Sequence, residues 1–153
     1  MTDGAPVLLV DDSPDDRFLA VTCWTRAAIP NPLVSLEDGQ KAIDYLAGRG
    51  TAGLPALVLL DLKMPVRNGF EVLAWMRARD ACRRVPVIMM TASELPGDVE
   101  KAYDLGANSF VVKPSSIEDL VELFRALNAW WLRVNVFPPE VGGAQRASAL
   151  APV

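Results

Sequence analysis

Histidine is missing from this chain of 153 residues. Without an imidazole the chain has no histidine base to activate a nucleophile, no histidine ligand for zinc and no phosphohistidine of its own. Cysteine is nearly as scarce, with only Cys23 and Cys82 present. Both fall in helix-like patterns, and a cytoplasmic chain keeps such thiols reduced, so we expect them to be small core side chains rather than a disulfide.

Long apolar runs and basic clusters are missing too. No apolar segment approaches the roughly 20 residues that span a bilayer, so we expect no contact with a membrane. The net charge is −4 and no basic stripe appears, which gives no reason to expect nucleic-acid binding. Residues 1–4 lack the basic start of a secretory signal, so we expect a cytoplasmic protein. The length suits one domain with a substantial core.

The chain does contain short apolar runs of strand length. They lie at 7–10, 33–36, 56–60, 85–90 and 109–112. Helical patterns separate them and follow turn or capping residues, as at Ser13-Pro14 and Ser115-Ser116. Strands that alternate with helices indicate βα units and a parallel sheet. Because crossovers are right-handed, we predict an α/β fold with a doubly wound five-stranded parallel sheet in the order 2-1-3-4-5 and five helices.

Polar residues stand at the carboxyl ends of four of these runs. They are Asp11 and Asp12 after the first, Asp61 after the third, Thr91 after the fourth and Lys113 after the fifth. In the predicted order these four strands are neighbours, so the five side chains should converge on one edge of the sheet. Each one alone also fits a solvated turn or helix-capping residue. All five at consecutive strand ends favour a shared site.

The chemistry of this set indicates a cation and a phosphoryl group. Two carboxylates about 4 Å apart repel by about 4 kcal/mol at an effective dielectric near 20, and a hard divalent cation relieves that repulsion. An all-oxygen site without histidine or cysteine favours Mg²⁺ or Mn²⁺ over zinc. The cation, the Lys113 ammonium and the Thr91 hydroxyl together suit a phosphoryl group, with Asp61 as its nucleophile.

Four motifs carry a family resemblance. They are LLVDDSPDD at 8–16, LVLLDLKMPVRNG at 57–69, VIMMTAS at 87–93 and FVVKP at 110–114. In this order they resemble the receiver domain of two-component response regulators, a flavodoxin-like fold, from about Val7 to Leu127. The resemblance implies that Asp61 is phosphorylated by a sensor histidine kinase or a phosphotransfer protein. It implies a phospho-acceptor that catalyses only its own phosphorylation and slow dephosphorylation.

The resemblance also implies roles for the neighbours of Asp61. Asp12 would bind Mg²⁺ directly, Asp11 through water, and the backbone carbonyl of Lys63 would be a further protein ligand beside Asp61. Lys113 would hold the phosphoryl group, and its peptide bond to Pro114 would be cis. Thr91 and Phe110 would be the switch pair that reshapes the surface formed by the fourth helix, fifth strand and fifth helix.

A narrower resemblance lies in the loop at 48–55 and in the segment from Trp130-Trp131 to Phe137-Pro138-Pro139. Both are similar to phytochrome-associated single-domain response regulators, which implies a bacteriophytochrome kinase as partner and a homodimer. The last helix independently favours a dimer, because it carries a second apolar stripe besides the one that should cover the sheet. That stripe is Leu123, Leu127, Trp130 and Val134. The alternative is that the following tail folds back over it.

We therefore expect a receiver domain at 5–130, a C-terminal extension at 131–141 that includes a possible dimer contact, and a disordered tail at 142–153. No output domain fits after residue 130, so output should be protein contact or phosphate relay. Two other functions remain open. An aspartyl-phosphate hydrolase of the haloacid dehalogenase class needs a second carboxylate where this chain has Lys63. A pseudo-receiver would bind partners without phosphorylation.

Overall fold

The computed structural model describes residues 4–50, 53–139 and 141. Its strands are β1 (Val7–Val10), β2 (Leu33–Leu36), β3 (Leu57–Leu60), β4 (Val87–Thr91) and β5 (Ser109–Val112). Its helices are α1 (Pro14–Arg26), α2 (Gly39–Ala47), α3 (Gly69–Arg77), α4 (Pro96–Asp104), α5 (Ile117–Leu127) and the π-helix η2 (Asn128–Val134). All strands are parallel in the order β2-β1-β3-β4-β5, so the predicted fold class is confirmed.

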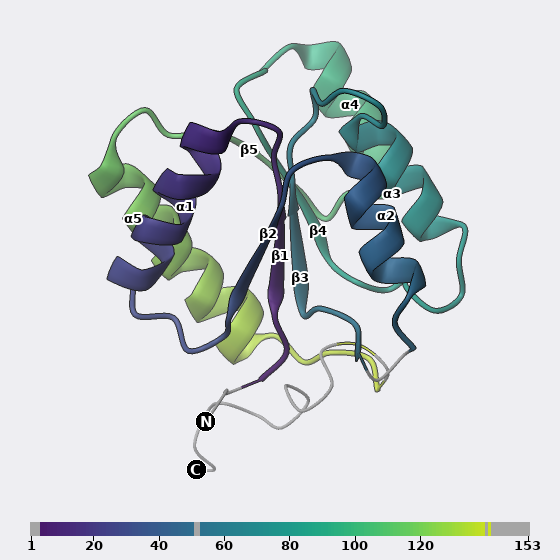
Figure 1. The fold of residues 1–153 in the computed structure, drawn as a ribbon, viewed down its shortest axis with the longest axis horizontal. Helices are drawn as coiled ribbons and strands as arrows, with labels where there is room; N and C mark the ends of the chain where they lie inside the picture. The colour runs from purple at the N-terminus through teal and green to yellow at the C-terminus, as the bar shows by residue number, and fades with distance from the viewer. Residues whose placement is uncertain (1–3, 51–52, 140, 142–153) are drawn as a thin grey trace.

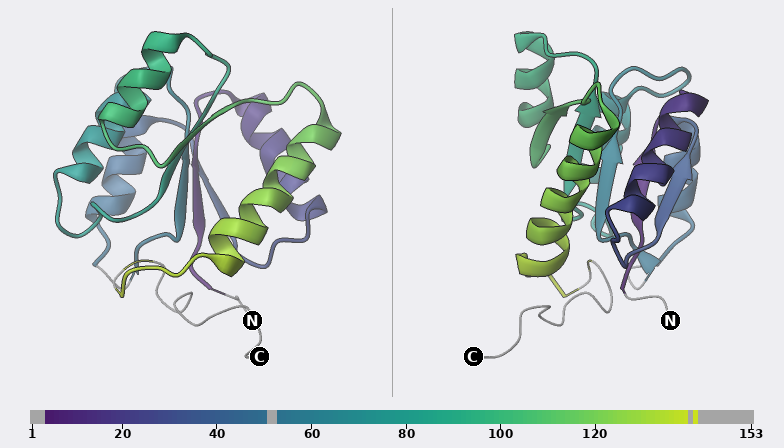
Figure 2. Two further views of the ribbon diagram at one scale, coloured as in Figure 1. Left: turned by 180° about the vertical axis from the view of Figure 1, so that it is seen from behind. Right: turned by 90° about the vertical axis from the view of Figure 1, so that its left-hand side faces the viewer.

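Helices cover both faces of the sheet. Helices α1 and α5 lie on one side, and α2, α3 and α4 lie on the other (Figure 1). Figure 2 shows α1 and α5 packed side by side. The three inner strands β1, β3 and β4 are fully buried, whereas the edge strands β2 and β5 are mostly half-buried. This two-sided cover is the reason that the inner strands are apolar without alternation.

The predicted helix starts are largely confirmed. The Ser13 hydroxyl accepts the N–H of Asp16 and Pro14 opens α1, while the Ser116 hydroxyl accepts the N–H of Asp119 at the start of α5. Helix α4 begins with Pro96 in its first turn. Proline suits the first helical position, where its missing N–H costs no hydrogen bond.

The structure differs from the predicted second apolar stripe on the last helix. Leu127 is buried and Leu123 is half-buried against the chain's own core, so neither is a free dimer contact. The 4-3-4 spacing assumes an α-helix, but α5 passes into a π-helix, in which residues five apart face the same side. Leu127 and Leu132 accordingly both face the core. Trp130, 59 % exposed, and Val134, 43 % exposed, remain on the surface.

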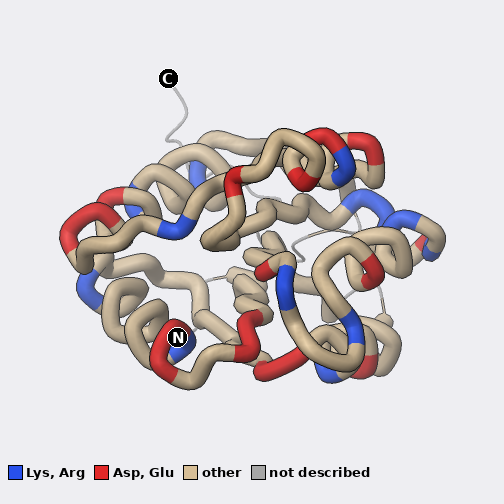
Figure 3. Tube along the Cα trace, turned by 90° about the horizontal axis from the view of Figure 1, so that it is seen from above, with Lys and Arg blue, Asp and Glu red and all other residues tan. Residues whose placement is uncertain are grey.

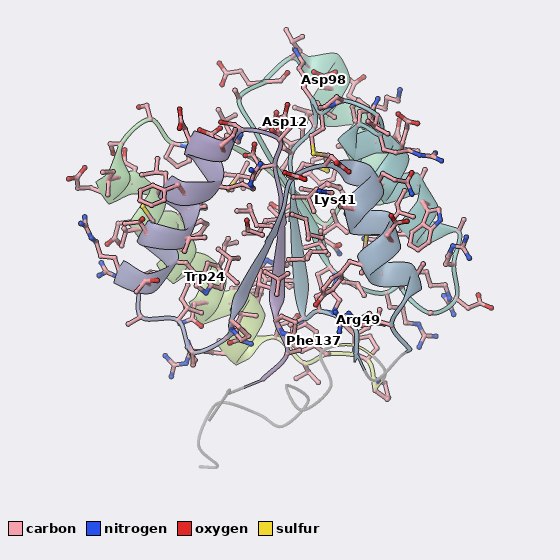
Figure 4. All side chains as sticks on the ribbon, viewed as in Figure 1. Asp12, Trp24, Lys41, Arg49, Asp98 and Phe137 are labelled. Atoms are coloured by element: carbon pink, nitrogen blue, oxygen red, sulfur yellow. The ribbon has the colours of Figure 1, made fainter. Side chains whose placement is uncertain are left out.

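The chain beyond η2 returns beneath the sheet. Phe137 and Val141 are buried, and Figure 4 places Phe137 below the amino ends of the strands. The predicted alternative, a tail that folds back, is thus met only in part, because Trp130 and Val134 stay exposed. The tail at 142–153, predicted to be disordered, lies outside the described residues. Within the described ranges, no helix has the length and apolar character needed to cross a membrane.

Gly69 lets α3 begin directly against the end of β3. A Cβ at Gly69 would lie 2.3 Å from the carbonyl oxygen of Asp61 and 2.9 Å from the Cα of Leu62. We predict that Gly69→Ala lowers the free energy of unfolding by about 1–3 kcal/mol, measured by urea denaturation, because the backbone must shift to admit the methyl group. The control is Gly97→Ala, where a Cβ meets nothing within 4 Å. Equal stability of the two variants would contradict this view of the turn.

Candidate functional site

Four strand ends meet at the carboxyl edge of the sheet. Asp11 and Asp61 directly follow β1 and β3, Thr91 ends β4, and Lys113 directly follows β5. Backbone bonds continue the sheet to this edge, since the N–H of Asp61 donates to the Val10 carbonyl and that of Lys113 donates to the Thr91 carbonyl. Acidic segments gather near the middle of this edge when it is viewed from above (Figure 3). The sheet therefore holds the predicted site residues together.

Three carboxylates form the acidic part of the site. Asp11, Asp12 and Asp61 each offer an oxygen, and these oxygens lie within 4.8 Å of one another. Asp11 and Asp61 are buried, while Asp12 is exposed and opens the cluster to solvent. Oxygen donors at this spacing, with water access on one side, fit a divalent metal ion.

The ammonium group of Lys113 contacts this acidic cluster and offsets part of its charge. Its Nζ lies 2.7 Å from Oδ2 of Asp11, 2.9 Å from Oδ2 of Asp16 and 3.2 Å from Oδ2 of Asp61. An ammonium group has three N–H donors, so these three carboxylates use all of them. Lys113 thus ties β5 to both central strand ends and to the first turn of α1.

Burial and charge act in opposite directions on these groups. Burial alone would lower the pKa of Lys113, but its hydrogen bonds to Asp11 and Asp16 and the charge of Asp61 outweigh burial and raise that pKa. Burial raises the pKa of Asp11, although the hydrogen bonds from Lys113 and from the Ser13 N–H work against the rise. Lys113 therefore stays charged at neutral pH and offsets part of the cost of the buried carboxylates.

Backbone contacts fix the orientation of the two buried carboxylates. Oδ1 of Asp61 accepts the N–H of Leu62 at 2.7 Å, which leaves Oδ2 facing Lys113. Oδ1 of Asp11 accepts the N–H of Ser13 at 2.9 Å, and the Asp11 carbonyl accepts a guanidinium N–H of Arg17 at 2.7 Å. Each aspartate thus presents one oxygen to the backbone and one to the shared ammonium.

A cavity of about 400 Å³ opens beside Asp61. Its lining residues are Asp61, Lys63, Thr91, Ala92, Ser93, Glu94, Leu95 and Lys113. The Thr91 hydroxyl accepts the Ser93 N–H at a long 3.4 Å, and the Ser93 hydroxyl donates to Oδ2 of Asp98 at 2.7 Å. The cavity gives a phosphoryl group room to reach Asp61, with a hydroxyl and an ammonium in its wall.

The family resemblance implies a switch role for Phe110 and a cis peptide bond before Pro114. Phe110 is half-buried on β5, opposite Met89 of β4, and packs against the core. The peptide bond before Pro114 is trans, since none of the described peptide bonds is cis. The expected cis form is therefore corrected. The two isomers of such a bond differ by only about 0.5–1 kcal/mol, so this feature is weakly determined by sequence.

Sequence reasoning missed Asp16 and the link from Ser93 to Asp98. A signal for Asp16 existed, because the Ser13-Pro14 start places it at the third helical position of α1. Side chains in a helix tilt toward its amino end, so an acid there points back to the end of β1. No comparable signal marked Ser93 and Asp98, because their contact depends on the path of the loop between β4 and α4.

Comparison with known proteins agrees with the fold. A sequence model of the response regulator receiver domain matches residues 7–125. The probable methanogenesis regulatory protein FilR2 of Methanothrix harundinacea is 34% identical over 134 residues, which cover 86% of each chain. Response regulator Rcp1 of Synechocystis is 32% identical over 135 residues, which cover 86% of this chain and 92% of Rcp1.

Solved structures give the same result. The phosphorylated cyanobacterial phytochrome response regulator RcpA superposes with a TM-score of 0.81 at 29% identity, over 89% of this chain and 99% of RcpA. The Mn²⁺-bound form of Rcp1 superposes with a TM-score of 0.77 at 31% identity, over 88% of this chain and 99% of Rcp1. The match at 7–125 spans most of the chain and includes every strand and the acidic cluster. The chain therefore belongs to the response regulator receiver domain family of two-component signalling.

Proposed function

We propose that Asp61 accepts a phosphoryl group from a sensor histidine kinase or a phosphotransfer protein, and that phosphorylation switches a protein-contact surface. One observation carries the proposal. The Asp61 carboxylate belongs to the acidic cluster that suits a divalent ion, contacts the ammonium of Lys113, and lines a cavity of about 400 Å³. A nucleophile, a fixed positive charge and room for the transferred group are the needs of phosphoryl transfer.

Each residue then has a role in the transfer. An oxygen of Asp61 forms a bond to phosphorus as the bond from phosphorus to the donor nitrogen breaks, and the donor imidazole takes up a proton as it leaves. Lys113 offsets the charge that develops on the phosphoryl oxygens. Asp12, Asp61 and the carbonyl of Lys63 would hold Mg²⁺, with Asp11 assisting through water. When bound, the ion neutralises negative charge and orients the phosphoryl group.

The switch would use the loop between β4 and α4. Among the residues that the structure describes, the Thr91 hydroxyl has a single long hydrogen bond, from the Ser93 N–H, so it can turn to a phosphoryl oxygen at small cost. Helix α4 is weakly anchored to the core, because Ala102 is its single buried residue. Leu95, which precedes it, provides no side-chain cap. The half-buried ring of Phe110 on β5 would turn inward as the loop moves. The contact surface would then be that of α4, β5 and α5.

Phytochrome signalling is the pathway that similarity favours. RcpA is described as a phytochrome response regulator, and both RcpA and Rcp1 match this chain over most of their length. We accordingly propose a bacteriophytochrome kinase as the partner, acting in the cytoplasm, where the buried free thiols Cys23 and Cys82 stay reduced. The receiver domain would span 5–130 and the extension 131–141. Neither nucleic acid nor a membrane is part of this proposal.

We further propose a homodimer that uses the extension. Trp130 and Val134 of η2 are exposed apolar side chains, and Val136 beyond it is 78 % exposed. Exposed tryptophan and valine side chains close together in sequence are typical of a contact surface, and tryptophan is enriched among residues that dominate binding energy. This narrower set replaces the four-residue stripe that the sequence predicts.

Phosphorylation is tested by mass. Wild-type protein incubated with Mg²⁺ and acetyl phosphate should gain the mass of one phosphoryl group, because the acidic edge is built to accept it. The adduct should decay slowly and be missing from Asp61→Asn. An Asp80→Asn variant, which changes an exposed aspartate after α3, should still form it. No adduct from acetyl phosphate or from the cognate kinase would favour a pseudo-receiver. Rapid multiple turnover of ordinary phosphate esters would favour a hydrolase.

The dimer is tested by sedimentation. Trp130→Ala should raise the dimer dissociation constant at least about tenfold, because truncation of a central interface tryptophan commonly has an effect of this size or larger. Phe18→Ala removes another exposed aromatic ring, on α1, and should leave the constant unchanged. A wild-type protein that sediments as a monomer at micromolar concentration, with and without phosphorylation, would end the dimer proposal.

A further inference from the structure

We propose that Asp16 is a positioning residue that holds the ammonium of Lys113 in place for phosphoryl transfer to Asp61. The inference rests on the proposed function of Asp61. Its basis is the 2.9 Å contact between Oδ2 of Asp16 and Nζ of Lys113. This contact is shorter than the 3.2 Å contact between Lys113 and Asp61.

The three partners of Lys113 differ in what phosphorylation does to them. Asp61 changes chemically, so its contact with Nζ must be replaced by one to a phosphoryl oxygen. Asp11 and Asp16 do not change and can hold the ammonium before and after transfer. A lysine side chain is flexible and has many rotamers, so a second permanent anchor restricts where its charge can lie. Fixed charge assists transfer more than mobile charge does.

The position of Asp16 is itself fixed by the start of α1. Its backbone N–H donates to the Ser13 hydroxyl, and the Ser13 N–H donates in turn to Oδ1 of Asp11. The two anchors of Lys113 are thereby connected through one capping residue. Asp16 lies outside the group of carboxylates that could share a metal ion, so its effect on the reaction should pass through Lys113.

Lys113 has room to move if Asp16 is removed. A cavity of about 40 Å³ lies beside its side chain, larger than the roughly 10–15 Å³ that one water requires. Asp16, Met90 and Leu120 lie in its lining with Lys113. With Asp16 truncated, the lysine stem can relax toward this space, and the ammonium can leave the position from which it reaches Asp61.

Asp15 provides a matched control for charge. It precedes Asp16 in the same first turn of α1 and is exposed, and its carboxylate is not among the three that contact Lys113. Removal of either aspartate makes the protein less negative by one charge. A less negative site should react faster with an anionic donor, so slower transfer in Asp16→Ala alone would reflect the lost anchor.

The experiment compares rates of phosphorylation by acetyl phosphate, followed by mass, in full-length wild type, Asp16→Ala, Asp16→Asn and Asp15→Ala. We expect the maximal rate of Asp16→Ala to be about fivefold below that of Asp15→Ala, the scale of a partly exposed ion pair. The half-saturating concentrations of donor and Mg²⁺ should be unchanged. Asp16→Asn keeps an acceptor oxygen and should fall between. Should Asp16→Ala fail to fold, Asp16→Asn against Asp15→Asn decides the same point.

Exchange of the Lys113 ammonium protons with water, measured by ¹⁵N NMR on metal-free protein, gives a second readout. Exchange should be faster in Asp16→Ala than in Asp15→Ala. Equal exchange, or an Asp16→Ala protein that is phosphorylated as fast as Asp15→Ala, overturns the inference. A wild type that accepts no phosphoryl group from acetyl phosphate or a kinase overturns the proposed function itself. If wild type reacts and Asp16→Ala matches Asp15→Ala, only the inference about Asp16 fails.

Discussion

The ion pairs of Lys113 are the interaction on which the carboxyl edge depends. Two buried carboxylates, Asp11 and Asp61, lie beside an exposed third, and their mutual repulsion would favour an open edge. One ammonium contacts both buried groups and, through Asp16, the first turn of α1. The carboxylates in turn raise the pKa of Lys113 above its ordinary value. Lys113 thus offsets only part of the negative charge at this edge, and the charge that remains suits a divalent ion.

The remainder of the fold divides into a rigid part and a part that can move. The rigid part is β3 between β1 and β4, buried on both faces, with Gly69 packed against the carbonyl of Asp61. It fixes the position of Asp61, the proposed nucleophile. The part that can move is α4 and the loop before it, where Ser93 contacts both Thr91 and Asp98. A change at Asp61 can therefore reach the surface through a short loop while the sheet stays in place.

Sequence alone predicts the sheet well, and it predicts that polar residues after the strands meet at one edge, because both depend on simple patterns. Buried parallel strands are apolar runs, and the residue after each run must appear at the carboxyl edge. The misses concern local geometry, which the patterns of apolar runs and strand ends do not describe. An α-helical period places Leu127 in an exposed stripe, but the chain passes into a π-helix directly after Leu127, which is buried. Asp16 was overlooked because a first-turn acid usually only complements the helix dipole.

Urea denaturation tests most directly whether Lys113 offsets the repulsion between the buried carboxylates. Wild type and Lys113→Met are compared, each in a metal chelator and in millimolar Mg²⁺. In chelator, the free energy of unfolding of Lys113→Met should be about 2 kcal/mol lower than that of wild type, because Asp11 is left buried without its partner. The loss should be clearly smaller in Mg²⁺, since the ion then offsets the same carboxylates. Equal losses in both conditions, or no loss in chelator, would contradict the account.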